Sequence, residues 1–180
     1  MKRLLLVLLC FLGVATTYAQ DYKVRNNDVM IERIIENTGM SVQQAHDKMM
    51  AVLVNVFNDS NKTLRLDQPD HIIYKGIMPD LAYQGMGSFS LLADMYVDVA
   101  IKENRMRIQV YANNIFDNGR NFSYNITELA PINEAHDTWR CPITKKTANT
   151  MFNNLVAKMY NLALSLEKSL AQPLKNDDNW

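Results

Sequence analysis

Two stretches of this 180-residue chain, 91–101 and 106–115, alternate between apolar and polar side chains, and they constrain its fold more than any other feature. The apolar positions are Leu91, Ala93, Met95, Val97, Val99 and Ile101 in the first, and Met106, Ile108, Val110 and Ala112 in the second. Successive side chains of a strand point to opposite faces, so each stretch predicts a strand with one apolar face. Between them lies Lys102-Glu103-Asn104-Arg105, where Asn104 tolerates the left-handed conformation that tight turns often need. The pair therefore predicts an antiparallel hairpin with one face covered and one exposed.

Segments on either side of the hairpin predict further strands. They are expected at 29–35, 63–67, 71–77 and around 121–127, each bounded by turn-forming residues. The segment 128–143 contains Pro131 and Pro142 and is expected to be irregular.

Two amphipathic helices complete the pattern. Ser41 is a plausible N-cap for a helix over 42–58, in which Ala45, Met49 and Val56 recur at helical spacing. A longer apolar stripe predicts a helix over 145–171, and its width fits packing on a sheet better than a separate partner-binding face. The residues of that stripe are Ala148, Met151, Phe152, Leu155, Met159, Leu162, Leu166 and Leu170.

The order of these elements indicates the fold class. A strand, a helix, four or five antiparallel strands and a closing helix follow one another along the chain. Each helix needs an apolar surface and the sheet offers one, so both helices are expected on the same face of an α+β fold with two layers. A single domain over 29–171 is expected, with a loose lead-in at 20–28 and a flexible tail at 172–180.

The N-terminus has the features of a cleavable secretory signal peptide over 1–19. A basic start at Lys2 and Arg3 precedes an apolar run, and small residues at Thr17 and Ala19 fit a cleavage site. The run is shorter than the ~20 residues of a membrane span. Cys10 lies inside it and follows Leu9, which does not fit a lipid-anchoring motif. The sequence therefore predicts a soluble periplasmic or secreted protein without a membrane span after signal cleavage.

The charge and cysteine content of the mature chain narrow its chemistry. Loss of Lys2 and Arg3 lowers the basic residues from 19 to 17, against 19 acidic ones. A slightly acidic protein lacks the excess of Lys and Arg that neutralises nucleic-acid phosphates. Cys141 is then the one cysteine left, so no internal disulfide is expected and the core must hold the fold.

The element order and the turn at 102–105, behind a signal peptide, resemble a family of exported bacterial proteins. This family is common in Bacteroidetes and is known as a domain of unknown function with a fold like the TATA-box-binding protein (TBP). The resemblance covers roughly 29–171 and implies a β-α-β4(5)-α arrangement. Asn104 stands where the family often has Gly, and the first helix lacks the Trp frequently found there. The resemblance brings no activity with it.

The DNA-binding role of the family's namesake is not expected to carry over, since a fold does not determine a function. The corresponding face here would mix acidic and basic side chains and lacks the apolar wedges of a minor-groove binder. Its polar residues are Asp94, Tyr96, Asp98, Arg107, Gln109, Tyr111 and Asn113. No nucleic-acid partner is therefore expected.

Catalytic and metal-binding patterns are weak. His46, His71 and His136 lie in three separate elements, so no metal site and no cofactor are expected. Asp94 and Asp98 share a strand face but would lie ~13 Å apart, too far for a retaining glycosidase pair. These observations predict a protein that is not an enzyme. The alternative is an envelope hydrolase with a site in the loop 128–143, formed by His136, Asp137 and Cys141.

The most ligand-like surface is the open sheet face at Tyr96, Arg107, Gln109 and Tyr111, because tyrosine and arginine are common in interfaces. The leading hypothesis is a non-enzymatic binding module of the cell envelope that uses this face, with an unknown protein or small ligand as partner. A carrier of a small apolar ligand between sheet and helices is a further alternative.

The predicted cleavage is directly testable. Expression of the full chain with its own N-terminus in a bacterium should yield an exported protein whose first residue is Gln20, because signal peptidase cuts after small residues. Mass spectrometry of the intact protein and of its N-terminal peptide measures this. A chain that retains residues 1–19 would contradict the prediction.

Overall fold

The predicted hairpin forms the centre of the sheet. The computed structural model describes residues 22–25, 28–36, 38–57, 63–84, 89–119, 123–126 and 144–171. In it, strands β5 (Phe89–Lys102) and β6 (Arg105–Asp117) pair antiparallel. Asn104 has a φ of 57°, which confirms the left-handed turn residue. The apolar positions from Leu91 to Ile101 and from Met106 to Ala112 are at most 3% exposed, so one face of the hairpin is fully covered.

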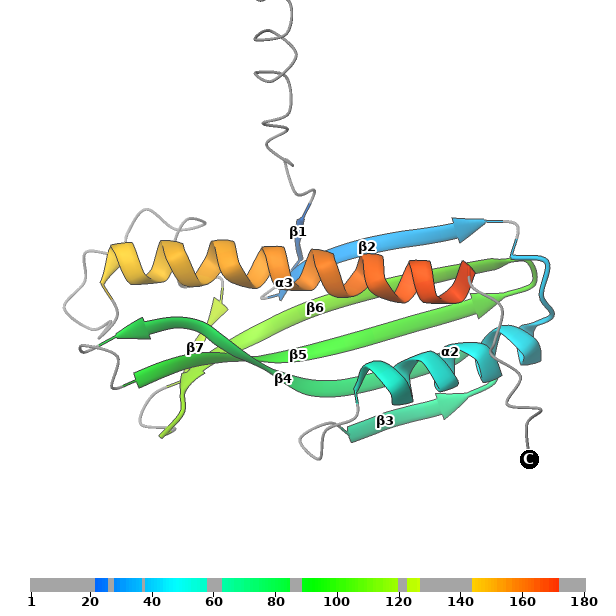
Figure 1. Ribbon diagram of the computed structural model, residues 1–180, viewed down its shortest axis with the longest axis horizontal. Coiled ribbons are helices and arrows are strands. Elements are labelled where there is room, and N and C mark those ends of the chain that lie inside the picture. Colours follow the sequence, from blue (N-terminus) through cyan, green and yellow to red (C-terminus); the bar gives the residue numbers. More distant parts are fainter. Residues whose placement is uncertain are drawn as a thin grey trace, which may run out of the picture.

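The described strands extend this hairpin into a seven-stranded antiparallel sheet (Figure 1). The additional strands are β1 (Lys23–Arg25), β2 (Asp28–Glu36), β3 (Thr63–Gln68), β4 (His71–Gln84) and β7 (Ser123–Asn125). The strand order is β1-β2-β6-β5-β4-β3, and β7 pairs with β6. The first long strand, β2, therefore lies beside β6, with Ile31 opposite Val110.

Helices α2 (Val42–Val56) and α3 (Lys145–Ala171) both lie on the covered face of the sheet (Figure 1). α3 contacts β2, β4 and β6, while α2 contacts β5 and α3. Residues of the predicted stripe such as Met151, Leu155 and Leu166 are fully buried against the sheet. The predicted α+β fold, with two helices on one face of an antiparallel sheet, is confirmed. Of the helices in the described part of the chain, none combines the length and apolar character needed to cross a membrane.

The start of α2 and the bounds of α3 follow the predictions closely. The Ser41 side chain accepts a hydrogen bond from the Gln44 backbone N–H, and the Gln44 side chain accepts one from the Ser41 N–H. This capping box satisfies two of the N–H groups that a helix start leaves unpaired. α2 ends at Val56, two residues before the predicted end, and the ring of Phe57 stacks on Tyr74 with centroids 5.2 Å apart.

The strands differ from prediction in two places, and the strand expected around 121–127 is present as β7, with 121, 122 and 127 outside the described residues. The lead-in predicted to be loose contains the short strand β1, which pairs with β2. β4 continues past the predicted end at 77 to Gln84. The reason is a bulge between Met78 and Ala82, where the register with β5 shifts and Asp80 adopts a φ of 54°.

Polar side chains of α3 stabilise this bulge. Lys158 Nζ donates to the backbone carbonyl of Pro79 at 2.6 Å and to that of Asp80 at 3.3 Å. Asn154 Nδ2 donates to the carbonyl of Leu81 at 2.7 Å. A bulge disrupts the regular strand ladder, and these bonds pair backbone groups that would otherwise cost free energy if buried. The helix therefore supports the continuation of β4 beyond its proline.

His46 connects α2 to β3. Its ring nitrogens lie 2.7 Å from Oδ1 of Asp67 and 3.2 Å from Oδ1 of Asp47. Burial of the ring acts to lower its pKa, but the hydrogen bonds to Asp47 and Asp67 outweigh burial, so the pKa of His46 is raised. The His46 side chain is only 13% exposed and bridges two elements, so it is more than a polar side chain on the helix surface.

Replacement of His46 by Gln is expected to destabilise the protein more in mild acid than in mild alkali. The folded-state pKa is higher than the unfolded one, so the stabilisation is fully present below about pH 6.5 and is lost as the pH rises through the folded pKa. Urea unfolding of both proteins at about pH 5.5 and about pH 8.5 measures the difference. Asp67→Asn, which removes the partner on β3, should give the same pattern. An equal loss of stability at both pH values would contradict it.

Candidate functional site

The four residues predicted as a binding face lie together on the open side of the sheet. Tyr96 is on β5 and stands directly opposite Tyr111 on β6. Gln109 and Arg107 follow Tyr111 at every second position of β6, alternating with buried residues such as Ile108. The prediction that these side chains share one uncovered face is confirmed, whereas a binding role for them stays a prediction.

An aromatic stack forms the middle of this face. The rings of Tyr96 and Tyr111 have centroids 4.9 Å apart and planes inclined by 7°. Lys75 on β4 places its Nζ 5.3 Å from the Tyr96 ring centroid and 3.4 Å from Oδ1 of Asp94. Aromatic pairs at this distance and a cation over a ring both contribute favourable energy. Lys75, Asp94, Tyr96 and Tyr111 therefore form a preorganised row across β4, β5 and β6.

Tyr111 stays a neutral phenol over the physiological range. Burial is the main cause that raises its pKa to about 12, and the nearby charges of Asp98 and Asp28 and the Tyr96 hydroxyl add to it. Asp98 itself lies 3.0 Å from Nε2 of His71. Since Asp94 pairs with Lys75 and Asp98 with His71, the two acids are parts of separate cross-strand pairs, consistent with the interpretation that they are not a catalytic pair.

Glu32 on β2 lies at the edge of this row. Gln109 Nε2 donates to its Oε2 at 2.6 Å, and Lys23 Nζ contacts its Oε1. The hydrogen bond with Lys23 is the largest cause of a lowered pKa for the Glu32 carboxyl, followed by the one with Gln109, and Arg107 adds an attractive charge. Both carboxylate oxygens of Glu32 are therefore engaged, and the group stays ionised.

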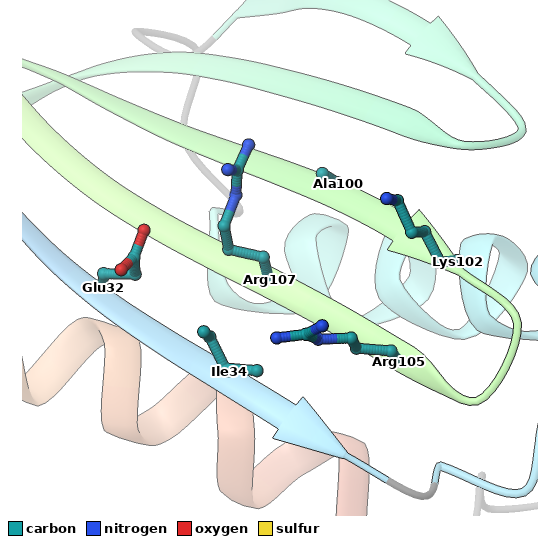
Figure 2. A pocket seen from close by; sticks show the side chains of 6 residues that line it. All are labelled: Glu32, Ile34, Ala100, Lys102, Arg105 and Arg107. Carbon is teal, nitrogen blue, oxygen red and sulfur yellow. The ribbon is translucent and has the colours of Figure 1, made fainter.

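A pocket of about 450 Å³ opens on the same face near the turn of the hairpin (Figure 2). It is lined by Glu32, Ile34, Ala100, Lys102, Arg105 and Arg107. The residues come from β2, β5 and β6, and Figure 2 shows Arg105 extending towards Ile34 and Arg107 extending towards β5. The outer edge is held by an ion pair in which Arg105 Nε lies 3.0 Å from Oε1 of Glu36.

The other sites considered from the sequence fare differently. The hydrolase alternative with His136, Asp137 and Cys141 lies outside the described residues. His46 and His71 each contact carboxylates, and within the described segments there is no group of three or more His, Cys, Asp and Glu side chains that could hold a metal ion.

Of the six residues that line the pocket, sequence reasoning identified Arg107 alone. Lys102 and Arg105 were interpreted as turn residues, although their cross-strand pairing follows from the hairpin itself. Glu32 and Ile34 fall in the strand predicted at 29–35, but nothing in the local pattern says that this strand pairs with β6. The sequence therefore does not place them at the site. The signal that was available is the spacing of Arg105 and Arg107, which puts both cations on one strand face.

Comparison with known proteins supports the fold. No protein-family model matches the chain, and neither does any curated protein sequence. Two similar solved structures are a DUF4468 family protein from Bacteroides ovatus ATCC 8483 and a TBP-like protein from Parabacteroides distasonis ATCC 8503, each 11% identical with a TM-score of 0.64. The first match covers 87% of this chain and 93% of the other, and the second 83% and 97%. The resemblance to Bacteroidetes proteins of unknown function with a TBP-like fold is thus confirmed in structure.

The aromatic stack is expected to contribute to stability beyond the area that each ring buries. In a double-mutant cycle of Tyr96→Ala and Tyr111→Ala, the coupling energy should be about 0.5–1.5 kcal/mol, the range for offset or edge-on aromatic pairs. Chemical denaturation of the wild type, both single variants and the double variant measures it. Tyr96→Phe keeps the ring and should leave most of the coupling intact. Single effects that add to within about 0.3 kcal/mol would contradict a coupled stack.

Proposed function

We propose that this protein is a non-enzymatic binding module of the bacterial envelope, and that its ligand or partner sits on the open face of the sheet. The observation that carries the proposal is that one face which neither helix covers holds both the Tyr96–Tyr111 stack and, further along the same strands, a pocket of about 450 Å³. Ligand pockets typically measure about 300–1,000 Å³. The signal peptide predicted at 1–19 supports the envelope as the place of work.

The interactions among the polar side chains favour binding over catalysis. Lys75 pairs with Asp94, His71 with Asp98, and Gln109 with Glu32. Side chains locked by neighbours lose little conformational entropy when a ligand arrives, which raises affinity. A general base, in contrast, needs an acceptor atom that faces the substrate, whereas these carboxylates face neighbouring side chains.

The face favours a partner that combines a flat apolar part with negative charge. The tyrosine rings and the exposed Ile34 offer contact area, and Lys102 and Arg107 offer positive charge. Tyrosine and arginine are enriched among residues that dominate binding energy.

A carrier of a small apolar ligand is supported less. A second pocket, of about 390 Å³, opens where β2 meets the ends of both helices. Its lining includes Ile35, Met40 and Leu170, but also charged side chains such as Lys48 and Glu167. A mixed lining of this kind suits an apolar ligand poorly, because an apolar ligand would displace water from the charged groups without replacing its hydrogen bonds, which costs free energy.

The proposal is tested by retention of a partner from the native envelope. Immobilised wild type should retain a component that is lost from Tyr96→Ala/Arg107→Ala/Tyr111→Ala, because truncation of central aromatic and arginine side chains removes most of the binding energy. Val54→Ala/Asn55→Ala serves as the control, since both residues are exposed on α2. Quantitative mass spectrometry of the retained material, with circular dichroism to verify folding, gives the measurement.

Equal retention by all three proteins would contradict the proposal, and so would a wild type that retains nothing above a blank matrix. Loss from the open-face variant together with retention by the control would support it.

A further inference from the structure

The pocket at the turn end of the open face concentrates positive charge. Its lining contains three cationic side chains, Lys102, Arg105 and Arg107, and one carboxylate, Glu32. Glu32 is already bound to Lys23 and Gln109 through its two oxygens. Arg105 pairs with Glu36. Neither Lys102 nor Arg107 has an ion-pair partner among the residues that the structure describes.

The pairing of the strands makes this concentration costly for the fold. Lys102 stands directly opposite Arg105 in the hairpin, and like charges in that position repel each other. Arg107 stands between Ala100 on β5 and Ile34 on β2. The acidic group that attracts it in the pocket, Glu32, already binds Lys23 and Gln109. A bound anion would relieve the repulsion between these cations.

The arrangement of the cations suits an anion with several acceptor oxygens. Arginine offers planar donors that fit phosphate and carboxylate, and lysine adds a point charge. A carboxylate carries one charge and two oxygens, whereas a phosphomonoester carries about −1.5 to −2 charges and three oxygens at neutral pH. Of these two groups, the phosphomonoester is the one with enough charge and acceptor oxygens for three cations.

We infer that this pocket binds a phosphomonoester group, with Arg107 and Lys102 as its main contacts and Arg105 completing the site from the Glu36 ion pair. The inference rests on the proposed function of the open face and names the chemistry of its ligand. Ile34, which is 46% exposed, and Ala100 supply an apolar surface for the organic part next to the phosphate. The Tyr96–Tyr111 stack lies further along β5 and β6, where a larger ligand would continue.

A phosphomonoester can belong to a soluble molecule or to a lipid headgroup, and both present the same group to the pocket. Phenyl phosphate represents the soluble source, because its ring matches the apolar surface at Ile34. Vesicles of phosphatidylcholine with phosphatidic acid represent the lipid source, with pure phosphatidylcholine vesicles as the blank. Benzoate tests whether a simple carboxylate is bound as well.

Isothermal titration of the chain without its signal segment with phenyl phosphate should show saturable binding with one site. Arg107→Gln and Lys102→Gln should each weaken it about tenfold or more, because hydrogen bonds to charged groups are strong. Lys146→Gln, a change of an exposed lysine near the start of α3, should leave it unchanged. Benzoate should bind at least about tenfold more weakly than phenyl phosphate. Cosedimentation with phosphatidic acid vesicles, lost in Arg107→Gln, would assign the lipid source.

Absence of saturable binding to both phosphate probes, equal binding by Arg107→Gln, or benzoate affinity equal to that of phenyl phosphate would overturn the inference. These results differ from failure of the proposed function. If a native partner is lost from the open-face variant while phenyl phosphate does not bind, only the ligand chemistry is wrong. If phenyl phosphate binds through Arg107 while partner retention is the same in all proteins, the phosphomonoester site is supported and the proposed function is contradicted.

Discussion

Burial of one face of the β5–β6 hairpin under α2 and α3 is the interaction on which the rest of the structure depends. The inward side chains of the hairpin, among them Val97, Val99 and Ile108, are fully buried. They meet the Phe152 and Leu155 side of α3 in one continuous core. A one-residue slip would turn every one of these side chains to the opposite face, so the core also sets the register. In that register Tyr96 stands opposite Tyr111. The packing of the buried face therefore determines which side chains are neighbours on the open face.

The two layers also explain why the open face is rigid. One ion pair joins β2 to α3, with Arg33 Nη2 2.6 Å from Oε2 of Glu167. On the opposite side of the same strand, Glu32 contacts Lys23 and Gln109. The strand that supplies one wall of the pocket is therefore held from both sides.

Much of this architecture was predictable, and the exceptions have physical causes. The alternation of the hairpin and the stripe of α3 report burial directly, so the covered faces and the bounds 145–171 were predicted correctly. The end of β4 predicted at 77 was wrong because a proline such as Pro79 normally interrupts a central strand, whereas β4 continues to Gln84. Here Lys158 and Asn154 satisfy the carbonyls around it, an interaction between distant segments that no local pattern encodes.

The candidate site divides in the same way. Tyr96 and Tyr111 were found because side-chain alternation places them on a face, whereas Ile34 was missed because its position depends on strand order. β1 was missed for a related reason, since three residues carry too little pattern to predict a strand without its partner β2.

The pairing of β2 with β6 has a further consequence for how the molecule matures. The hairpin is local in sequence and can close in about 1–10 μs, as hairpins do. β2 is separated from β6 in the chain by α2 and three strands, and such non-local pairing slows folding. A partly folded chain can therefore present its tyrosines while the basic pocket still lacks a wall. Occupancy of that pocket would then mark a chain that has completed its topology.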